Sequence, residues 1–435
     1  MKRTIILDVF AQWVTAILRS VPARLRPTLA ELFIGCIISP KGHITSALQS
    51  IRYALCWSSY HNAIQEGAFS WKALVRGWLD VILSAVAMDE LLLVIDDSIL
   101  MRSSKKAPGV DEHYDHANRA NRPRFLRGQL LVCASVVLQG KGRIGTVPLL
   151  QSLSKAGGNA TKLQIAAVLH RRILRWLAAR LPVRVMADAW YMKGPFIHDV
   201  LRKGSHALGM VRSDTALKAV LTPEQIAQAK QKRKGPGRAK KYGEKLTLKR
   251  IKELFVPQRF TAHAYSKERH FEAYCFDAHV VFLKHRICRM VWCRMENKKL
   301  KDGWTRWHLI LSTDLDAAMD ARRIVNLYAM RWWIEPEFHE IKFTFGLKEA
   351  WQQSRIAFDR WRTMLCIAYG IAKLMAIVFG DEAGKDLAPI AWRTKGRTTA
   401  GWVSHALHRI FYNSEIRSLW DRKQQKFVMP FRDSA

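Results

Sequence analysis

Four side chains with different chemistry recur at helical spacing between positions 328 and 342. They are Tyr328, Arg331, Glu335 and Lys342, separated by three, four and seven residues. At about 100° per residue these steps return to nearly the same azimuth, so the four groups would share one face of a helix. A carboxylate binds divalent cations, whereas a guanidinium or ammonium group binds phosphate. The pattern indicates a metal ligand among phosphate-binding groups, or else a solvent-exposed charged stripe, which shows the same spacing.

Further carboxylates follow two apolar, strand-like runs. One run ends in Asp96 and Asp97, and the other ends in Asp188. Cleaving or joining a phosphodiester without a covalent intermediate uses two divalent cations held by carboxylate oxygens on rigid elements. Asp188 and Glu335 could supply two of these carboxylates. Successive strand residues point to opposite faces, so only one of Asp96 and Asp97 can supply the third.

The chain around these acids predicts an α/β core. A helix is expected over 161–180. Strands are expected at 91–98, 129–139, 146–153, 183–188 and 207–212. This order matches the ribonuclease-H-like arrangement, a mixed five-stranded sheet in which the first and fourth strands are neighbours. The acids at the ends of those two strands would therefore converge.

The remaining sequence predicts how the core is divided and extended. Residues 27–51 could form a helix-turn-helix or simply part of a small helical bundle. A helix is expected over 314–346, with Thr313 or Asp314 as its N-cap, and another over 354–379. The predicted parts are a helical N-terminal DNA-binding domain over 1–90, the first part of the core over 91–214, a basic loop plus a β-rich insertion over 215–313, the second part of the core over 314–380 and a basic helical C-terminal region over 381–435.

The insertion begins with a strongly basic segment. Between Lys230 and Arg250 there are ten Lys or Arg residues and one acidic residue. Such a run is either a solvated flexible loop or a phosphate-binding surface, and the high net charge of the chain favours the second interpretation. The residues expected to contact DNA here are Lys232, Arg233, Lys234, Arg238, Lys240 and Lys241.

Composition points to a polyanionic partner. In 435 residues, 71 Lys and Arg against 36 Asp and Glu leave a net charge of +35. Nucleic acid is the usual partner of such a chain, although ribosome association or an anionic membrane would suit the charge. Seven scattered cysteines without a Cys-x-x-Cys pair indicate reduced thiols rather than a zinc site. The longest apolar stretch, 366–379, carries Lys373 and is too short to span a bilayer, so a cytoplasmic location without a membrane partner is expected.

The segment LYAMRWWIEPEFHEIKFTFGL contains Tyr-x2-Arg-x3-Glu-x6-Lys. It resembles the signature of DDE transposases of the insertion-sequence type-four superfamily. Ile-Asp-Asp-Ser at 95–98, Met-Ala-Asp-Ala-Trp-Tyr at 186–191 and Ile-Leu-Ser-Thr-Asp at 310–314 stand where that superfamily has its surrounding segments. The resemblance extends in order from position 91 to 347, with a β-rich insertion between the second and third acids. It implies a ribonuclease-H-like catalytic core.

The resemblance also implies roles for individual residues. The superfamily's Asp-x-Ser/Thr pattern favours Asp96 over Asp97. The implied catalytic and metal-binding triad is Asp96, Asp188 and Glu335. The implied metal is a pair of Mg²⁺ ions, which Mn²⁺ can replace. The side chains implied to contact DNA phosphates near the scissile bond are Tyr328, Arg331 and Lys342. The candidates for stacking on a flipped base are Trp292, Trp304 and Trp307.

The function implied by the resemblance is that of a cut-and-paste transposase of a bacterial insertion sequence. Such an enzyme binds terminal inverted repeats, cleaves the DNA strands through a hairpin intermediate and transfers them to target DNA. Two protomers would bring two DNA ends together, and the protein would lie in the bacterial cytoplasm at the nucleoid. Two alternatives stay open. One is a ribonuclease-H-fold nuclease or resolvase that cuts without joining, and the other is an inactive DNA-binding regulator.

Pro336 directly follows the predicted helical ligand. Proline lacks an amide hydrogen and clashes with the carbonyl group four residues earlier, so a kink is expected near Glu335. A kink would leave Tyr328, Arg331 and Glu335 on one helix face and turn Lys342 away from it. Glu337 or Glu340 could replace Glu335 as the ligand.

Overall fold

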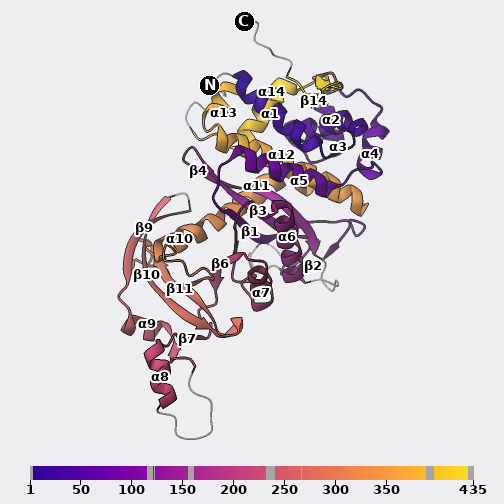
Figure 1. Ribbon diagram of the computed structural model, residues 1–435. Helices are drawn as coiled ribbons and strands as arrows, with labels where there is room; N and C mark the ends of the chain where they lie inside the picture. The colour runs from indigo at the N-terminus through magenta and orange to yellow at the C-terminus, as the bar shows by residue number, and fades with distance from the viewer. Residues whose placement is uncertain are drawn as a thin grey trace.

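A twelve-stranded mixed sheet forms the centre of the protein, as the computed structural model shows (Figure 1). The structure describes residues 3–114, 121, 123–154, 161–231, 241–265, 267–387 and 396–429. Five of the predicted DNA-contacting residues lie outside this described part of the chain. They are Lys232, Arg233, Lys234, Arg238 and Lys240.

Five strands of the sheet form the core. They are β1 (Leu91–Met101), β3 (Phe125–Gly140), β4 (Arg143–Ser154), β5 (Val183–Ala187) and β6 (His206–Val211). Their order is β4-β3-β1-β5-β6, with β1, β5 and β6 parallel to one another and β3 antiparallel to both β1 and β4. This order confirms the predicted ribonuclease-H-like fold.

The core strands form because their sequences are apolar and partly β-branched. Leu93, Val94 and Ile95 are all fully buried, as expected for a strand that is covered on both faces. The hairpin between β3 and β4 turns at Lys141 and Gly142, which both have positive φ angles, of 44° and 68°. A two-residue turn with positive φ at both positions has a backbone twist that matches the right-handed twist of the flanking strands.

Different helices cover the two faces of the core sheet. Leu93 and Ile95 face a cluster that includes α6 (Lys162–Leu177) and α7 (Gly194–Arg202). Val94 faces a second cluster that includes α10 (Ala321–Met330) and the start of α11 (Ile334–Phe343). Side chains of β1 therefore alternate between these two groups of helices, which decides where its acidic residues point.

One core-associated strand escaped sequence-based prediction. β2 (Val110–Tyr114) pairs antiparallel with the first residues of β3 at the edge of the sheet. Its sequence, Val-Asp-Glu-His-Tyr, is mostly polar, and only one of its five residues is buried. A short edge strand with two solvated faces lacks the apolar alternation on which strand prediction depends.

The insertion, residues 215–313, continues the core sheet. β12 (His308–Ser312) pairs antiparallel with β6, and β11 (Arg286–Met295) and β10 (Lys267–Val280) follow in order. The other insertion elements, at the lower left of Figure 1, are β9 (Gln258–Ala264), β7 (Leu217–Ala219), β8 (Lys245–Leu246), α8 (Pro223–Gln231), α9 (Leu248–Leu254) and the short 3-10 helix at Val281–Leu283.

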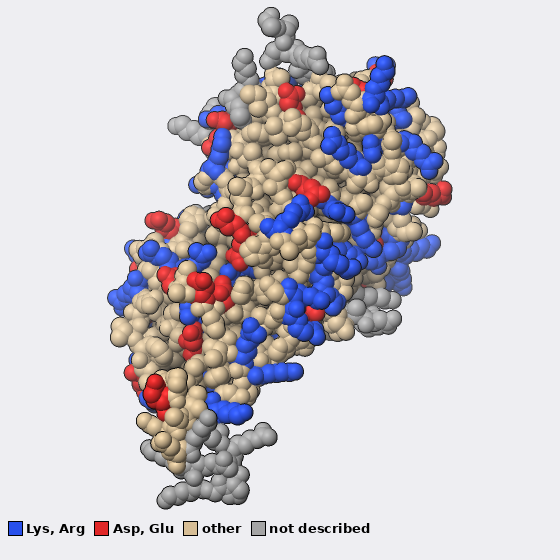
Figure 2. Space-filling model, viewed as in Figure 1, with Lys and Arg blue, Asp and Glu red and all other residues tan. Residues whose placement is uncertain are grey.

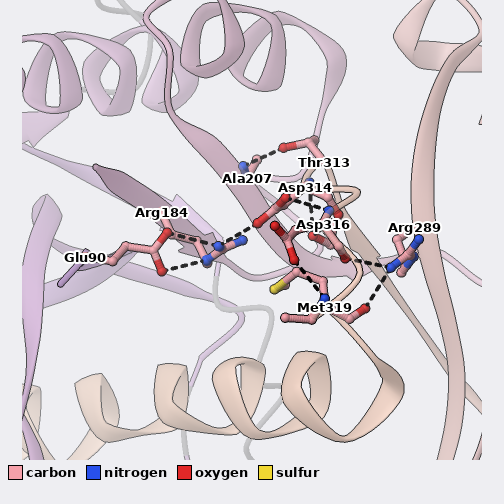
Figure 3. A network of polar contacts seen from close by, with 10 residues as sticks. Glu90, Arg184, Ala207, Arg289, Thr313, Asp314, Asp316 and Met319 are labelled. Atoms are coloured by element: carbon pink, nitrogen blue, oxygen red, sulfur yellow. Dashed lines mark hydrogen bonds and ion pairs between the residues drawn. The ribbon is translucent and has the colours of Figure 1, made fainter. Parts of the chain in front are cut away.

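The chain leaves the insertion through a network of polar contacts (Figure 3). Arg184 of β5 is nearly buried, and it donates to Glu90 at 3.0 Å and to Asp314 at 2.8 Å. Thr313 accepts a hydrogen bond from the Ala207 amide at 2.8 Å. This network fixes the return of the chain against the core strands. It also explains why the next helix does not begin at Thr313 or Asp314: α10 begins at Ala321, after Asp320.

The first and last parts of the chain form one helical body, at the top of Figure 1. Its N-terminal helices are α1 (Arg3–Leu18), the 3-10 helix at Ala23–Leu25, α2 (Arg26–Ile38), α3 (Ile44–Gln49), α4 (Trp57–Gln65) and α5 (Trp71–Ala85). They pack against α12 (Arg355–Val378), α13 (Glu382–Leu387), α14 (Ala400–Phe411), the 3-10 helix at Ile416–Leu419 and the hairpin of β13 (Trp420–Asp421) and β14 (Lys426–Phe427). The buried Glu31, for example, accepts from Arg417 at 2.9 Å.

The segment 27–51 packs as part of this bundle. Every residue of α2 from Pro27 to Ile38 is buried, and α3 has only six residues. This is the packing of a core helix and a short connecting helix, the second of the two sequence-based interpretations. The role of residues 1–90 in DNA binding stays a prediction.

Helix α12 is the longest helix of the described residues. By length and composition it could cross a membrane, and it is the one described helix that meets that test. Most of its surface is buried between the helical body and the sheet, including Trp361, Met364 and Leu365. Its apolar composition is therefore explained by packing in the protein core.

Candidate active site

Two consecutive aspartates of β1 face opposite sides of the sheet. They lie within the strand, which continues to Met101, at the point where its pairing with β5 ends. Asp96 faces the α10–α11 side, where its carboxylate accepts a hydrogen bond from Arg331 at 2.9 Å. Asp97 faces the other side, where it contacts Lys162 of α6 at 3.1 Å and accepts from the Tyr191 hydroxyl at 2.8 Å. Strand alternation thus separates their environments, and Asp96 is the one that faces the helix carrying the predicted third ligand.

Asp188 lies beside Asp96. Ile95 of β1 and Ala187 of β5 form the last pair of the parallel register, so the two aspartates follow directly on neighbouring strands. The Asp188 carboxylate accepts from the Trp190 amide at 3.0 Å, which holds it in the turn toward α7. Burial raises the pKa of Asp96 to about 7; Arg331 opposes the rise, and the nearby Asp188 adds to it.

The helix predicted to carry the four-residue pattern is interrupted. α10 ends at Met330, a 3-10 turn covers Arg331–Trp333, and α11 starts at Ile334. The predicted kink is therefore confirmed, and Pro336 occupies the first turn of α11, where a missing amide hydrogen costs least. From this 3-10 turn the Arg331 side chain reaches Asp96 of β1.

Arg331 connects the groups that the sequence pattern singled out. Its guanidinium contacts Asp96 at 2.9 Å and Glu335 at 3.7 Å, and it lies 5.8 Å from the ring centre of Tyr328. Lys342, one helical segment further on, donates to the Ser98 hydroxyl of β1 at 2.5 Å. The structure thus brings all four residues of the pattern to the same side of β1, despite the interruption of the helix.

The other acidic residues of α11 point elsewhere. Glu337 is fully buried and accepts from Ser135 of β3 at 2.6 Å, and burial raises its pKa to about 7. Glu340 forms an ion pair with Lys373 of α12 at 3.6 Å. Glu335 is therefore the α11 carboxylate that contacts Arg331, the residue that also contacts Asp96.

The three predicted ligands are not gathered into one finished site. The Glu335 side chain is 56% exposed and contacts Arg331, whereas Asp96 and Asp188 lie where the pairing of β1 with β5 ends. Across the described ranges, no group of three or more His, Cys, Asp or Glu residues is arranged to hold a metal ion. The guanidinium of Arg331 lies where it compensates the charge of the acids.

The predicted tryptophans of the insertion are all engaged within it. Trp292 is buried, and Trp304 and Trp307 lie on the guanidinium of Arg294, each at 4.8 Å. Tyr265, at the turn between β9 and β10, is an insertion residue that contacts the 3-10 turn of the site, through Trp332.

Tyr265 was not predicted from the sequence. Its ring lies 5.7 Å from that of Trp332, and it is 48% exposed. Its backbone has a left-handed φ of 53°, which is uncommon for an aromatic residue. The only signal in the sequence is an aromatic residue at a hairpin turn. Its position depends on how the insertion sheet continues the core sheet, which periodicity does not reveal.

Basic side chains spread over the face that carries these elements. Figure 2 shows Lys and Arg across the middle of the molecule and down toward α8, with fewer acidic side chains between them. Among the predicted basic-loop residues, Lys241 is described, and it is exposed next to β8 in the insertion. It lies at the far end of the insertion from Asp96.

The chain thus has a ribonuclease-H-like sheet with two aspartates that directly follow the last paired residues of neighbouring parallel strands, and a helical segment nearby that bears Arg331 and Glu335. The chain belongs to the transposase DDE domain family, whose sequence profile matches residues 97–371. The match begins one residue after Asp96 and does not itself distinguish Asp96 from Asp97.

Among solved structures, the chain is similar to a piggyBac transposase in a synaptic complex with hairpin DNA, determined by cryo-EM. The two share 10% sequence identity with a TM-score of 0.39, over 94% of this chain and 79% of the other. No curated protein matches the chain significantly.

Proposed function

We propose that this transposase is the cut-and-paste enzyme of a bacterial insertion sequence. It binds the terminal inverted repeats as a homodimer at the nucleoid, cleaves the element's ends and joins them to target DNA. One observation carries the proposal: Asp96 and Asp188 directly follow the last pair of residues that joins the parallel strands β1 and β5, and Arg331 connects Asp96 to the helical segment that carries Glu335. The five-part organisation expected from the sequence, with DNA-binding residues 1–90, is part of this proposal.

The donor set suits Mg²⁺ or Mn²⁺. Asp96, Asp188 and Glu335 offer hard carboxylate oxygens, which such cations prefer to sulfur or nitrogen. The sheet holds the first two acids side by side at a partly buried position, where like charges are stable only with positive charge nearby. Two bound divalent ions would activate the attacking oxygen and stabilise the leaving one.

The other residues of the site bind and orient the DNA strand. Arg331 offers a planar set of donors that fits a phosphate, and release of Glu335 from Arg331 would free both groups. Lys342 is held against β1 by Ser98, so its ammonium group has a fixed position for a second phosphate. Tyr328 completes this surface; burial raises its pKa to about 12, which keeps its hydroxyl protonated.

The proposed hairpin intermediate needs a place for an unpaired base. Tyr265 is the aromatic side chain of the insertion that lies beside Trp332 and is half exposed. We assign the stacking role to Tyr265 in place of the three tryptophans, since Trp292 is buried and the other two contact Arg294.

The test uses the DNA that flanks the reading frame as a labelled substrate. Asp188→Asn should reduce Mg²⁺-dependent cleavage by more than ~100-fold, the upper end of what loss of an outer-shell partner costs. Asp214→Asn, which removes an exposed acid paired with Arg212, is the matched control and should cleave normally.

Each other outcome rejects part of the proposal. Retained cleavage by Asp188→Asn would show that the triad is misassigned. Cleavage by the wild type without joined product would identify a nuclease or resolvase. Tight binding without cleavage in either metal would identify a DNA-binding regulator.

A further inference from the structure

Asp97 is the centre of a polar cluster that the proposed chemistry does not use. It lies on the face of β1 opposite to Arg331. Both of its carboxylate oxygens contact the Lys162 ammonium group, at 3.1 and 3.2 Å, and one also accepts from the Tyr191 hydroxyl at 2.8 Å. The Asp97 side chain is 19% exposed, and that of Lys162 is 20% exposed. Asp97 is thus held by two partners from two other elements.

Tyr191 connects Asp97 to Asp188. Its hydroxyl donates to Asp97, while its backbone amide donates to the Asp188 carboxylate at 3.2 Å. The ring is fully buried and packs against Trp190 and Phe196, at ring-centre distances of 5.0 and 6.4 Å. The buried ring and the bound hydroxyl fix the position of this side chain, so the turn that carries Asp188 is held at this point.

Lys162 extends the cluster to α6. It is the first residue of that helix, which Thr161 caps. Its ammonium group lies 3.9 Å from the ring centre of Trp190, and that of Lys193 lies 4.3 Å from the same ring. The positive charge of Lys162 compensates Asp97, so this second aspartate does not add uncompensated negative charge beside Asp96.

We propose that Asp97, Tyr191 and Lys162 form a brace that sets the position of the Asp188 carboxylate relative to Asp96. Asp97 is then a positioning residue and not a metal ligand. The inference rests on the proposed function, because it assigns the brace to the metal site proposed there.

Backbone pairing alone does not achieve this positioning. The parallel register ends at Ile95 and Ala187, so Asp188 lies beyond the ladder, on a turn. A metal site needs its ligands held within about 0.5 Å, and outer-shell hydrogen bonds supply that precision. The hydrogen bond from the Tyr191 hydroxyl to Asp97 is a side-chain link from the Asp188 turn back to β1.

The first experiment measures metal affinity separately from catalysis. Tyr191→Phe removes the hydroxyl and keeps the ring, and Mn²⁺ binding to the full chain without DNA is followed by the electron paramagnetic resonance signal of free Mn²⁺. The dissociation constant should rise about tenfold or more, with lower kcat and unchanged KM for DNA. Tyr60→Phe removes another buried hydroxyl in the helical body and should bind Mn²⁺ normally.

A second set of variants separates a brace from a ligand. Lys162→Met should weaken Mn²⁺ binding in the same direction as Tyr191→Phe, and circular dichroism checks that both are folded. Wild-type affinity in both variants would overturn the proposal. So would loss of Mn²⁺ binding in Asp97→Asn as complete as in Asp96→Asn, combined with wild-type affinity in Tyr191→Phe, since Asp97 would then be a ligand.

The failure of the underlying function gives a different result. If Asp96→Asn and Asp188→Asn bind Mn²⁺ as tightly as the wild type, the proposed metal site itself is wrong and the brace is overturned with it. If those two variants lose Mn²⁺ and only Tyr191→Phe and Lys162→Met do not, the site stands and the brace alone is rejected.

Discussion

Arg331 is the residue on which the geometry of the site depends most. Its guanidinium reaches Asp96 at 2.9 Å and Glu335 at 3.7 Å from a short 3-10 turn. A planar group with several donors can contact two carboxylates at once, which a lysine ammonium on a flexible stem does less well. The same group suits the phosphate of a DNA strand. Arg331 therefore links two of the acids, and in the proposed function it would also contact the DNA strand.

His170 predicts how the stability of the core depends on pH. It is fully buried in α6, with its ring bound to the Ser205 hydroxyl at 2.9 Å. Burial lowers its pKa to about 4; Asp199 opposes this shift and Arg171 adds to it. The unfolded imidazole binds a proton near pH 6.5, so this contribution is complete above that pH and is lost as the pH falls toward 4.

The expected loss is about 2 kcal/mol of unfolding free energy between about pH 7 and pH 5. Urea unfolding at the two pH values measures this loss. The unfolding free energy of His170→Gln should fall by about 2 kcal/mol less than that of the wild type over the same pH interval. His405→Gln, which changes an exposed histidine of α14, is the control and should follow the wild type. An identical pH profile in His170→Gln and the wild type would contradict this assignment.

The charged residues of the site could be picked out from the sequence, but the residues that contact them could not. The spacing of Arg331 and Glu335 and the position of Asp188 after an apolar run indicated their grouping. The partners of Asp97 come from α6 and from the turn after β5, and Tyr265 comes from a distant hairpin. Such contacts depend on tertiary packing, which local patterns do not encode.

The C-terminal end of β1 is connected to the turn that follows α11. Arg102 follows β1, is 7% exposed, and donates to Gln129 of β3 at 2.7 Å and to the Ala350 carbonyl at 3.0 Å, with a further contact to the Lys348 carbonyl. Ala350 and Lys348 belong to the turn that follows α11. The C-terminal end of the strand with Asp96 is therefore held against the turn that follows the helix with Lys342.

Arg102→Met tests this connection. It leaves several buried acceptors without donors, so the unfolding free energy should fall by ~2–4 kcal/mol. Urea denaturation provides the measurement. Arg212→Met is the matched control, because Arg212 pairs with Asp214 on the surface and its loss should cost less than ~1 kcal/mol. Equal effects of the two substitutions would show that Arg102 does not fasten these elements.

The β9–β10 hairpin makes its own prediction. Tyr265→Ala should leave first-strand nicking within about threefold of the wild type and reduce hairpin formation about tenfold or more, since base stacking on an aromatic is worth ~1–3 kcal/mol. Denaturing gels of end-labelled DNA separate the two products. Tyr412→Ala, at an exposed position after α14, should change neither. Normal hairpin yield in Tyr265→Ala would reject the stacking role.

Elements with strong periodicity were predicted well, and those set by tertiary contacts were not. β1, β3, β5 and α12 follow from apolar runs or helical spacing. The helix expected from Thr313 starts instead at Ala321, because Thr313 and Asp314 are used to bind Ala207 and Arg184. Capping residues are interchangeable in local sequence, and the surrounding contacts decide which one is used.

The net charge of the whole chain predicts how its affinity for DNA depends on salt concentration. A net charge of +35 implies binding that weakens steeply with salt, because each neutralised phosphate releases bound counterions. The described basic residues next to the predicted loop are Lys241, Lys245 and Lys249, all exposed.

Replacing these three lysines with glutamine should reduce the slope of log K against log salt concentration by up to ~0.9 for each phosphate that is no longer neutralised. Fluorescence anisotropy between low and physiological salt measures the slope. Replacing Lys385, Lys423 and Lys426 removes the same charge from exposed positions in the helical body. The same change of slope in both triple variants would mean that net charge, and not the insertion, determines the affinity.

The direct pairing of β12 with β6 has a mechanical consequence. The ladder runs without interruption from β10 through β11 and β12 to β6 and β5, so bending the insertion against the core would require breaking backbone hydrogen bonds. The insertion is therefore rigidly connected to the core sheet through these paired strands. If Tyr265 stacks on a DNA base as proposed, a force on the β9–β10 hairpin would be transmitted through these paired strands to β5, the strand that Asp188 follows.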